Sequence, residues 1–217
     1  MAIKQNANVF RVMVDPRGFM RDFSPAMRRY SWAIAWVFGT VLLMAKAFAF
    51  SLGVVYSAGY IFLGALIFGI PAGYIAIYLY SFFLYMTGKI FRGNATFQQV
   101  MDAYTWTRVV ELFPLLSWLC LMALFGKYAF TPEFLDSQKY MFLVSALIGV
   151  QAVSQVWEVV ILFHTLGEIQ GLSAWITIWN VLFASVLFLI VDGAINWMFS
   201  STVVMGSFSL MGSLFYR

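Results

Sequence analysis

Residues 59–86 read GYIFLGALIFGIPAGYIAIYLYSFFLYM and contain no charged side chain. A helix needs about 20 mostly apolar residues to cross a bilayer, so this stretch predicts a transmembrane helix. Pro71 predicts a kink within it, because proline removes a backbone donor. Gly69-x-x-x-Gly73 is the spacing by which membrane helices pack closely.

The regions on either side repeat this pattern. No charged residue falls in 47–88, 112–126, 140–157, 169–191 or 193–216. We therefore predict an all-α fold, a polytopic membrane bundle of five transmembrane helices. Their predicted bounds are Tyr30–Leu52, Gly59–Met86, Val109–Phe130, Tyr140–Leu166 and Ala174–Phe199.

Composition supports this class. Hydrophobic residues make up 63% of the 217 positions and charged residues 10%, where soluble chains carry about 25% charged residues. The mean hydropathy is +0.86. These values exclude a soluble enzyme and a disordered chain. Cys120 is the single cysteine, so neither a disulfide framework nor a cysteine metal site is expected.

The distribution of basic residues predicts the orientation. Nine of the 13 Lys and Arg residues precede the first span or lie between the second and third spans. By the positive-inside rule, the N-terminus is then cytoplasmic and the C-terminus lies outside. Three regions follow: a cytoplasmic interfacial segment over 1–29, the five-helix domain over 30–199, and an apolar tail over 200–217 on the outer side.

The two cytoplasmic segments are predicted to be helical. In 1–29, apolar residues alternate with Arg11, Arg17 and Arg21, as in helices that lie in the membrane interface. Thr96 and Gln99 form a capping box that starts a helix over 96–108. That helix either lies on the cytoplasmic leaflet or continues into the third span and packs under the bundle.

Ionisable groups within the spans need partners. Lys46 and Asp192 lie in the outer halves of two spans that run in the same direction, so they are able to pair. Glu158 lies in an inner half, at the depth of Arg108. Gln151 and Gln155 share a helix face with Glu158 through their i, i+4, i+7 spacing, and Asn180 lies at a similar depth in the fifth span. These side chains complete a predicted intramembrane network. The network either ties helices together or forms a polar path for a proton, ion or small solute.

Catalytic and binding motifs are missing. The sequence contains no H-E-x-x-H pair, no G-x-S-x-G elbow and no P-loop. No basic patch with interleaved aromatic residues suggests nucleic-acid binding. His164, four residues before Glu168, is expected to form a surface pair. We therefore expect no enzymatic activity, no cofactor and no metal.

Short motifs resemble those of the Yip1-domain family of five-span membrane proteins. Asp15-Pro16 followed by Phe19 resembles the family's DP-x-x-FF start. Residues 88–100 resemble its GG-x-x-(T/S)F segment. The positions that carry the resemblance are Asp15, Pro16, Phe19, Gly88, Gly93, Thr96, Phe97, Tyr104, Pro114 and Gly171.

The resemblance has implications for function. The long cytoplasmic arm of eukaryotic members, with its DLYGP motif, is absent, so the chain resembles the short prokaryotic form and is expected in the inner membrane. The resemblance implies a non-enzymatic membrane scaffold or adaptor, associated with an exporter or a similar complex. Its partners would be the lipid bilayer and another membrane protein or itself. A small GTPase is a partner by family analogy alone. The alternative function is a solute or proton-coupled transporter that uses Lys46, Glu158 and Asp192.

Overall fold

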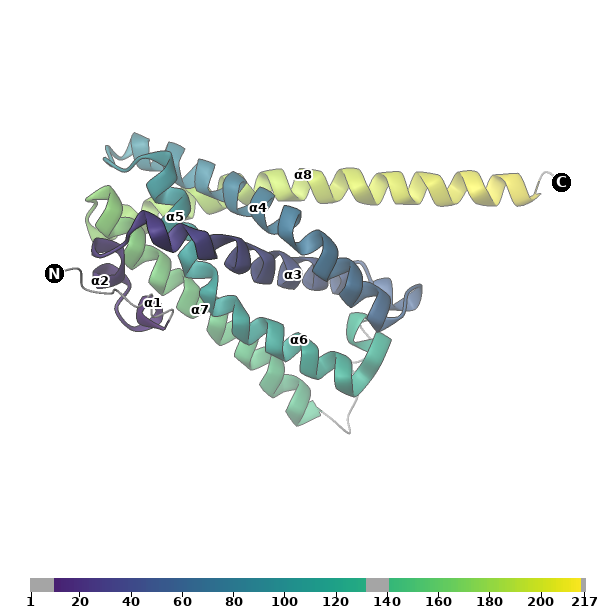
Figure 1. Ribbon diagram of the computed structural model, residues 1–217. Coiled ribbons are helices and arrows are strands. Elements are labelled where there is room, and N and C mark those ends of the chain that lie inside the picture. The colour runs from purple at the N-terminus through teal and green to yellow at the C-terminus, as the bar shows by residue number, and fades with distance from the viewer. Residues whose placement is uncertain (1–9, 132–140, 216–217) are drawn as a thin grey trace.

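The computed structural model describes residues 10–131 and 141–215, with side chains described as far as Ile195 and at Trp197 (Figure 1). All regular elements in this part of the chain are helices. They are α1 (Arg11–Val14), α2 (Pro16–Arg21), η1 (Pro25–Tyr30), α3 (Ser31–Ala49), η2 (Leu52–Val54), α4 (Ala58–Ile90), α5 (Phe97–Thr107), η3 (Arg108–Glu111), α6 (Leu112–Phe125), η4 (Gly126–Phe130), α7 (Met141–Gln170) and α8 (Ala174–Phe215).

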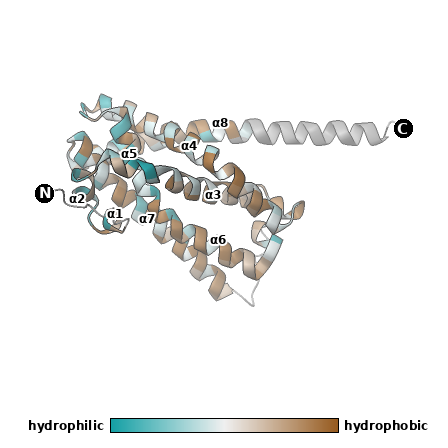
Figure 2. Ribbon diagram, viewed as in Figure 1, coloured by the Kyte–Doolittle hydropathy of each residue, from teal (hydrophilic) through white to brown (hydrophobic). Residues whose placement is uncertain are grey.

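The five predicted spans are confirmed. Five helical runs within the described residues are long and apolar enough to cross a membrane. Their bounds are Pro25–Ala49, Ala58–Ile90, Phe97–Phe130, Met141–Gln170 and Ala174–Ile195. Figure 2 shows hydrophilic residues gathered where α2 and α5 lie. We call this the α5 end of the bundle, and the opposite end, with η2 and η4, the η2 end.

Helices α4 and α7 both extend beyond their predicted span limits. Helix α4 continues to Ile90 and α7 continues to Gln170. The polar residues Thr87 and Gln170 lie in these extra turns and are buried by neighbouring helices, with 3% and 2% exposure. Packing at the α5 end therefore keeps both helices regular beyond their apolar stretches.

Helices α3 and α4 approach each other at glycines. A Cβ placed on Gly39 would lie 1.9 Å from the Gly69 carbonyl oxygen and 2.5 Å from the Gly73 nitrogen. Glycine at these positions lets the two backbones touch, as the Gly69-x-x-x-Gly73 spacing predicts. The Trp36 indole nitrogen also donates to the Leu66 carbonyl over 2.8 Å. Helix α4 itself runs through Pro71.

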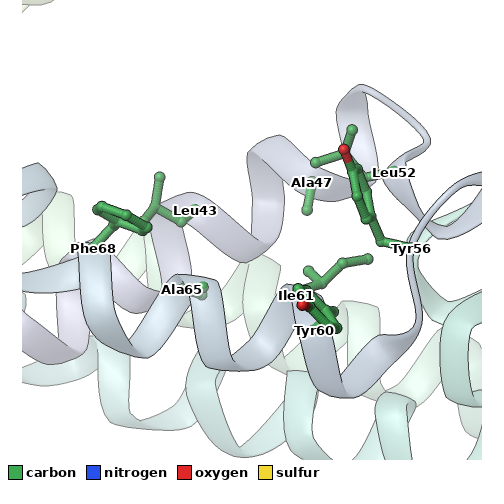
Figure 3. A pocket seen from close by; sticks show the side chains of 9 residues that line it. Leu43, Ala47, Leu52, Tyr56, Tyr60, Ile61, Ala65 and Phe68 are labelled. Atoms are coloured by element: carbon green, nitrogen blue, oxygen red, sulfur yellow. The ribbon is translucent and has the colours of Figure 1, made fainter.

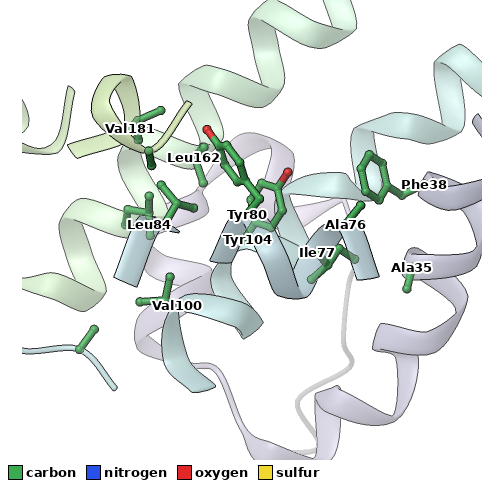
Figure 4. Packing of buried hydrophobic residues seen from close by; sticks show 13 residues of the cluster. Ala35, Phe38, Ala76, Ile77, Tyr80, Leu84, Val100, Tyr104, Leu162 and Val181 are labelled. Carbon is green, nitrogen blue, oxygen red and sulfur yellow. The ribbon is translucent and has the colours of Figure 1, made fainter. Parts of the chain in front are cut away.

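A hydrophobic cluster at the α5 end joins α3, α4, α5, α7 and α8 (Figure 4). Tyr80 and Tyr104 lie at its centre, with ring centroids 4.6 Å apart. A second cluster surrounds Trp118 and Phe130 at the η2 end. The packed rings and aliphatic side chains hold the five spans in fixed positions relative to one another.

Helix α5 is packed inside the bundle. Val100 and Trp106 are fully buried, and η3 connects α5 directly to α6. This is the packing that the second alternative for residues 96–108 predicts. The Thr96–Gln99 capping box is present, with the Thr96 side chain accepting from the Gln99 backbone nitrogen.

The N-terminal segment docks on α5. The Asp15 side chain caps α2 by accepting from the Gly18 backbone nitrogen over 2.9 Å. Phe19 is 2% exposed, and its ring centroid lies 5.0 Å from that of Trp106. Residues 1–9 of the predicted interfacial segment lie outside the described residues.

Helix α8 is assigned as one element to Phe215. Positions 200–215 of the predicted tail therefore belong to the helix that contains the fifth span. The last two positions, 216–217, lie outside the described residues. Apolar composition without a proline or a charge over 193–215 is compatible with an uninterrupted helix.

Candidate functional site

Arg108 lies at the centre of the most buried charged cluster. It begins η3, at the junction of α5 and α6. Its Nη1 donates to Glu158 of α7 over 2.7 Å and to Glu111 over 3.2 Å. Its Nη2 donates to the Tyr104 hydroxyl. One guanidinium thus links the third span to the fourth.

The surroundings of this cluster are apolar. The side chains of Arg108, Glu111 and Glu158 are 14%, 10% and 10% exposed. The guanidinium carbon lies 4.2 Å from the Phe38 ring centroid and 4.5 Å from that of Tyr104. A cation over an aromatic face is attracted by the ring, so α3 also contributes to the cluster. Such an arrangement anchors three helices around one cation.

Lys46 and Asp192 form the second intramembrane pair. The Lys46 Nζ lies 3.0 Å from each carboxylate oxygen of Asp192. Their side chains are 31% and 33% exposed. The pair connects α3 to α8. This is the pairing that the depths of Lys46 and Asp192 in their spans predict.

A neutral polar chain connects α4, α7 and α8 at the α5 end. The Thr87 hydroxyl donates to the Asn180 side chain over 2.5 Å, and Asn180 donates to the Gln170 side chain over 2.7 Å. All three residues are buried. Because unpaired polar groups are costly away from water, this chain specifies how the three helices meet.

The glycine motif at the end of α4 contacts this polar chain. A Cβ on Gly88 would lie 2.4 Å from the Gln170 Nε2, and a Cβ on Gly93 would lie 3.3 Å from the Gln170 Cβ. The Gly93 backbone nitrogen donates to the Gly88 carbonyl over 2.8 Å. Gly88, in the last turn of α4, and Gly93, in the loop after it, thus leave room for the Gln170 side chain at the end of α7.

Ion pairs attach the N-terminal segment to the bundle. Arg28 lies 2.7 Å from Asp102 of α5, which is 5% exposed. Arg21 lies 2.6 Å from Glu168 of α7, and this contact raises the pKa of the Arg21 guanidinium. Glu168 is thus paired with Arg21, and the expected surface pair with His164 is not formed. The His164 Nδ1 instead lies 2.8 Å from the Val160 carbonyl oxygen.

Other predicted positions are separate from the Arg108 cluster. Gln151 is half-buried and Gln155 is exposed. Neither has a hydrogen bond to Glu158 in the described part of the chain. The spacing of Gln151, Gln155 and Glu158 places them near one helix face. Of these three side chains, only that of Glu158 is buried in the bundle. Asn180 belongs to the Thr87 chain.

The remaining family-motif residues have structural roles. The Phe97 ring packs against Tyr78, with centroids 5.1 Å apart. Pro114 is buried in the first turn of α6, where a missing backbone donor is tolerated. Gly171 ends α7 with a φ of 65°, a conformation that glycine adopts at low cost.

Sequence reasoning missed Glu111 and Gln170. Glu111 follows Arg108 by three positions, which is a spacing that brings helical side chains together. The sequence therefore contained a signal for the contact between Arg108 and Glu111. Gln170 lies at a span end, where a polar residue is ordinary, so the sequence offered no sign that it would be buried.

Apolar grooves line the spans. One lies between α3 and α4 near the η2 end, with a volume of about 360 Å³ (Figure 3). Tyr56, Tyr60 and Phe68 line it. In the described residues, no group of three or more His, Cys, Asp or Glu side chains is arranged to hold a metal ion. The Arg108–Glu158 and Lys46–Asp192 pairs join different helices, and the groove between α3 and α4 is lined by aliphatic and aromatic residues and glycine.

Comparison with known proteins assigns the chain to a family. The family model described as the Yip1 domain matches residues 10–195, which include all five spans. No curated protein and no solved structure matches the chain. The matched region contains the Asp15 cap, the Gly88–Gly93 loop and the Arg108 cluster. The chain is a multi-pass integral membrane protein that belongs to the Yip1 domain family.

Proposed function

We propose that this protein is a non-enzymatic membrane scaffold or adaptor subunit. Two intramembrane ion pairs carry the proposal. Lys46 with Asp192 and Arg108 with Glu158 join different helices, at 3.0 and 2.7 Å. Interhelical pairs of this kind fix the position of helices. A rigid bundle with exposed apolar faces is suited to binding other membrane proteins.

Membership of the Yip1 family supports the non-enzymatic part of the proposal. The Yip1 family is a non-enzymatic membrane family. The Glu158 side chain is 10% exposed, so it is enclosed by protein. This burial favours a structural role for the carboxylate over a role in a hydrated path for a proton or ion, which remains the second candidate function.

The proposed orientation places the α5 end in the cytoplasm. Arg17, Arg29, Lys89 and Arg92 are all exposed there. Basic residues close to span ends are retained on the cytoplasmic side. The proposed location is the inner membrane of a prokaryotic cell, with the bilayer and another membrane protein, or a second copy, as partners.

Site-specific photocrosslinking in native membranes tests the adaptor role. We would place a photoreactive amino acid at Ile75 of α4 and Leu189 of α8, which are 68% and 65% exposed. Leu84, fully buried, is the matched control. We expect defined protein adducts from at least one exposed position and none from Leu84. A chain that forms lipid adducts alone from every exposed position contradicts an adaptor role.

A further inference from the structure

Two cavities on α7 share one lining residue. The first is a groove of about 490 Å³ between α6 and α7, lined by Phe113, Gly149 and Val153, with Trp157 at one end. The second is a pocket of about 240 Å³ between the α1–α2 turn and α7. Trp157 lines this pocket as well. The two cavities therefore adjoin at Trp157, and together we call them the depression along α7.

The two parts of this depression differ in polarity. Except for Ser154, the α6–α7 groove is lined by apolar side chains and glycine. The pocket next to it is lined by three titratable side chains, those of Asp15, Arg17 and His164, together with six apolar residues. Figure 1 shows α1 and α2 beside α7 at the α5 end. Polarity thus increases from the membrane interior towards the membrane surface.

The depression is long enough to hold one lipid of a leaflet. On α7 its lining residues run from Ala146 to His164, a separation of 18 positions, which corresponds to roughly 27 Å of helix. Half of a bilayer, with its headgroup region, measures roughly 20–22 Å. A single phospholipid therefore fits within the depression and has the same polarity gradient.

The polar mouth carries both signs of charge. Arg17 is exposed and forms no ion pair with the described residues. The Asp15 side chain is 56% exposed, with one oxygen accepting from Gly18 and the other 3.8 Å from the Arg11 guanidinium. A headgroup with a phosphate and an ammonium offers an opposite charge to each residue.

We propose that this depression binds one zwitterionic phospholipid of the leaflet at the α5 end. Its phosphate faces Arg17 and its ammonium faces Asp15. One acyl chain follows α7 past Val153 and Gly149. The site requires only that the protein spans the membrane, and it does not depend on the scaffold role.

Gly149 offers a way to fill the groove. A Cβ at Gly149 has no atom within 4 Å, so a larger side chain fits without a clash. Gly59, near the η2 end, is equally open and is not among the residues that line this depression. Gly149→Phe and Gly59→Phe are therefore matched variants that differ in their effect on the proposed acyl site.

Native mass spectrometry of the full chain in detergent measures the binding. The probe is dioleoylphosphatidylethanolamine, and dioleoylglycerol, which lacks the phosphate, is the comparison. We expect one bound phosphatidylethanolamine in the wild type and in Gly59→Phe. Gly149→Phe and Arg17→Ala should each weaken binding by about tenfold, because one removes space and the other a charged contact. Dioleoylglycerol should also bind about tenfold more weakly.

Several results overturn the proposal. Unchanged binding in both Gly149→Phe and Arg17→Ala removes the site. Equal affinity for dioleoylglycerol removes the role of the phosphate. Tighter binding of dioleoylphosphatidylglycerol contradicts the zwitterionic headgroup. Thermal unfolding of each variant provides the folding control, and Gly149→Leu replaces Gly149→Phe if the larger side chain lowers the melting temperature.

Discussion

Lys46 and Asp192 are 146 positions apart in the sequence, and their side chains meet at 3.0 Å. The contact holds α8, the last helix, against α3, the first long one. Each side chain is about one third exposed, at 31% and 33%. In a bilayer this exposed fraction borders lipid or the interface, where the pairing compensates both charges.

Removal of one partner should lower the free energy of unfolding more than removal of both. Lys46→Met leaves the Asp192 carboxylate without its cation, and we expect the free energy of unfolding to fall by roughly 2–3 kcal/mol. Lys46→Met with Asp192→Asn leaves no unpaired charge, so the loss should be smaller than in the single variant. Thermal unfolding in nanodiscs measures these two variants and the Asp192→Asn single variant. Simple additivity of the two single changes would refute the pairing.

The Arg108 cluster predicts that loss of Arg108 destabilises the protein more than loss of Glu158. Two carboxylates face one guanidinium, so Glu158→Gln leaves Arg108 balanced by Glu111. We expect that variant to lose about 1 kcal/mol of unfolding free energy. Arg108→Met leaves two buried carboxylates without a cation and should lose about 3 kcal/mol or more. Chemical unfolding in a mixed detergent measures both values, and equal losses would contradict this charge balance.

The α3–α4 contact predicts opposite outcomes for two glycines. Gly39→Ala places a methyl group against the Gly69 carbonyl oxygen. Overpacking of this kind costs about 1–3 kcal/mol. Gly64→Ala meets no atom within 4 Å, so its stability should equal or exceed that of the wild type, because alanine favours helix. Melting temperatures of the two variants check this, and a stable Gly39→Ala protein would show that the helices are not in backbone contact.

The proposed orientation predicts which loops are accessible from outside the cell. In a Cys120→Ala background, we expect Val55→Cys, near the η2 end, to react with a membrane-impermeant maleimide in intact cells. Asn94→Cys, in the loop after α4, should react only after the membrane is opened. Both native residues are exposed. The reverse pattern would invert the assigned topology.

The fold was largely predictable because charge-free stretches define membrane spans. Depth along the spans also identified Lys46 with Asp192 and Arg108 with Glu158 as candidate partners. Depth depends only on position in the chain, which the sequence contains. Rotation of each helix about its axis depends on packing, and it determines that Glu158 is buried while Gln155 is exposed.

The contacts of α5 show the same limit. Its capping box was evident from Thr96 and Gln99, but its place in the bundle depends on neighbours distant in sequence. Trp106 is fully buried because the N-terminal segment covers it with Phe19. Likewise, Gln170 acquires its role only where Gly88 and Asn180 approach it. No local sequence pattern predicts these contacts between residues that are distant in the chain.

The central claim is that the intramembrane charges tie helices together and do not conduct. Proton flux into proteoliposomes tests it most directly, with an enclosed pH-sensitive dye and an imposed pH gradient. We predict that vesicles containing wild-type protein dissipate the gradient at the rate of protein-free vesicles. Faster dissipation by the wild type that is lost in Glu158→Gln would contradict the account.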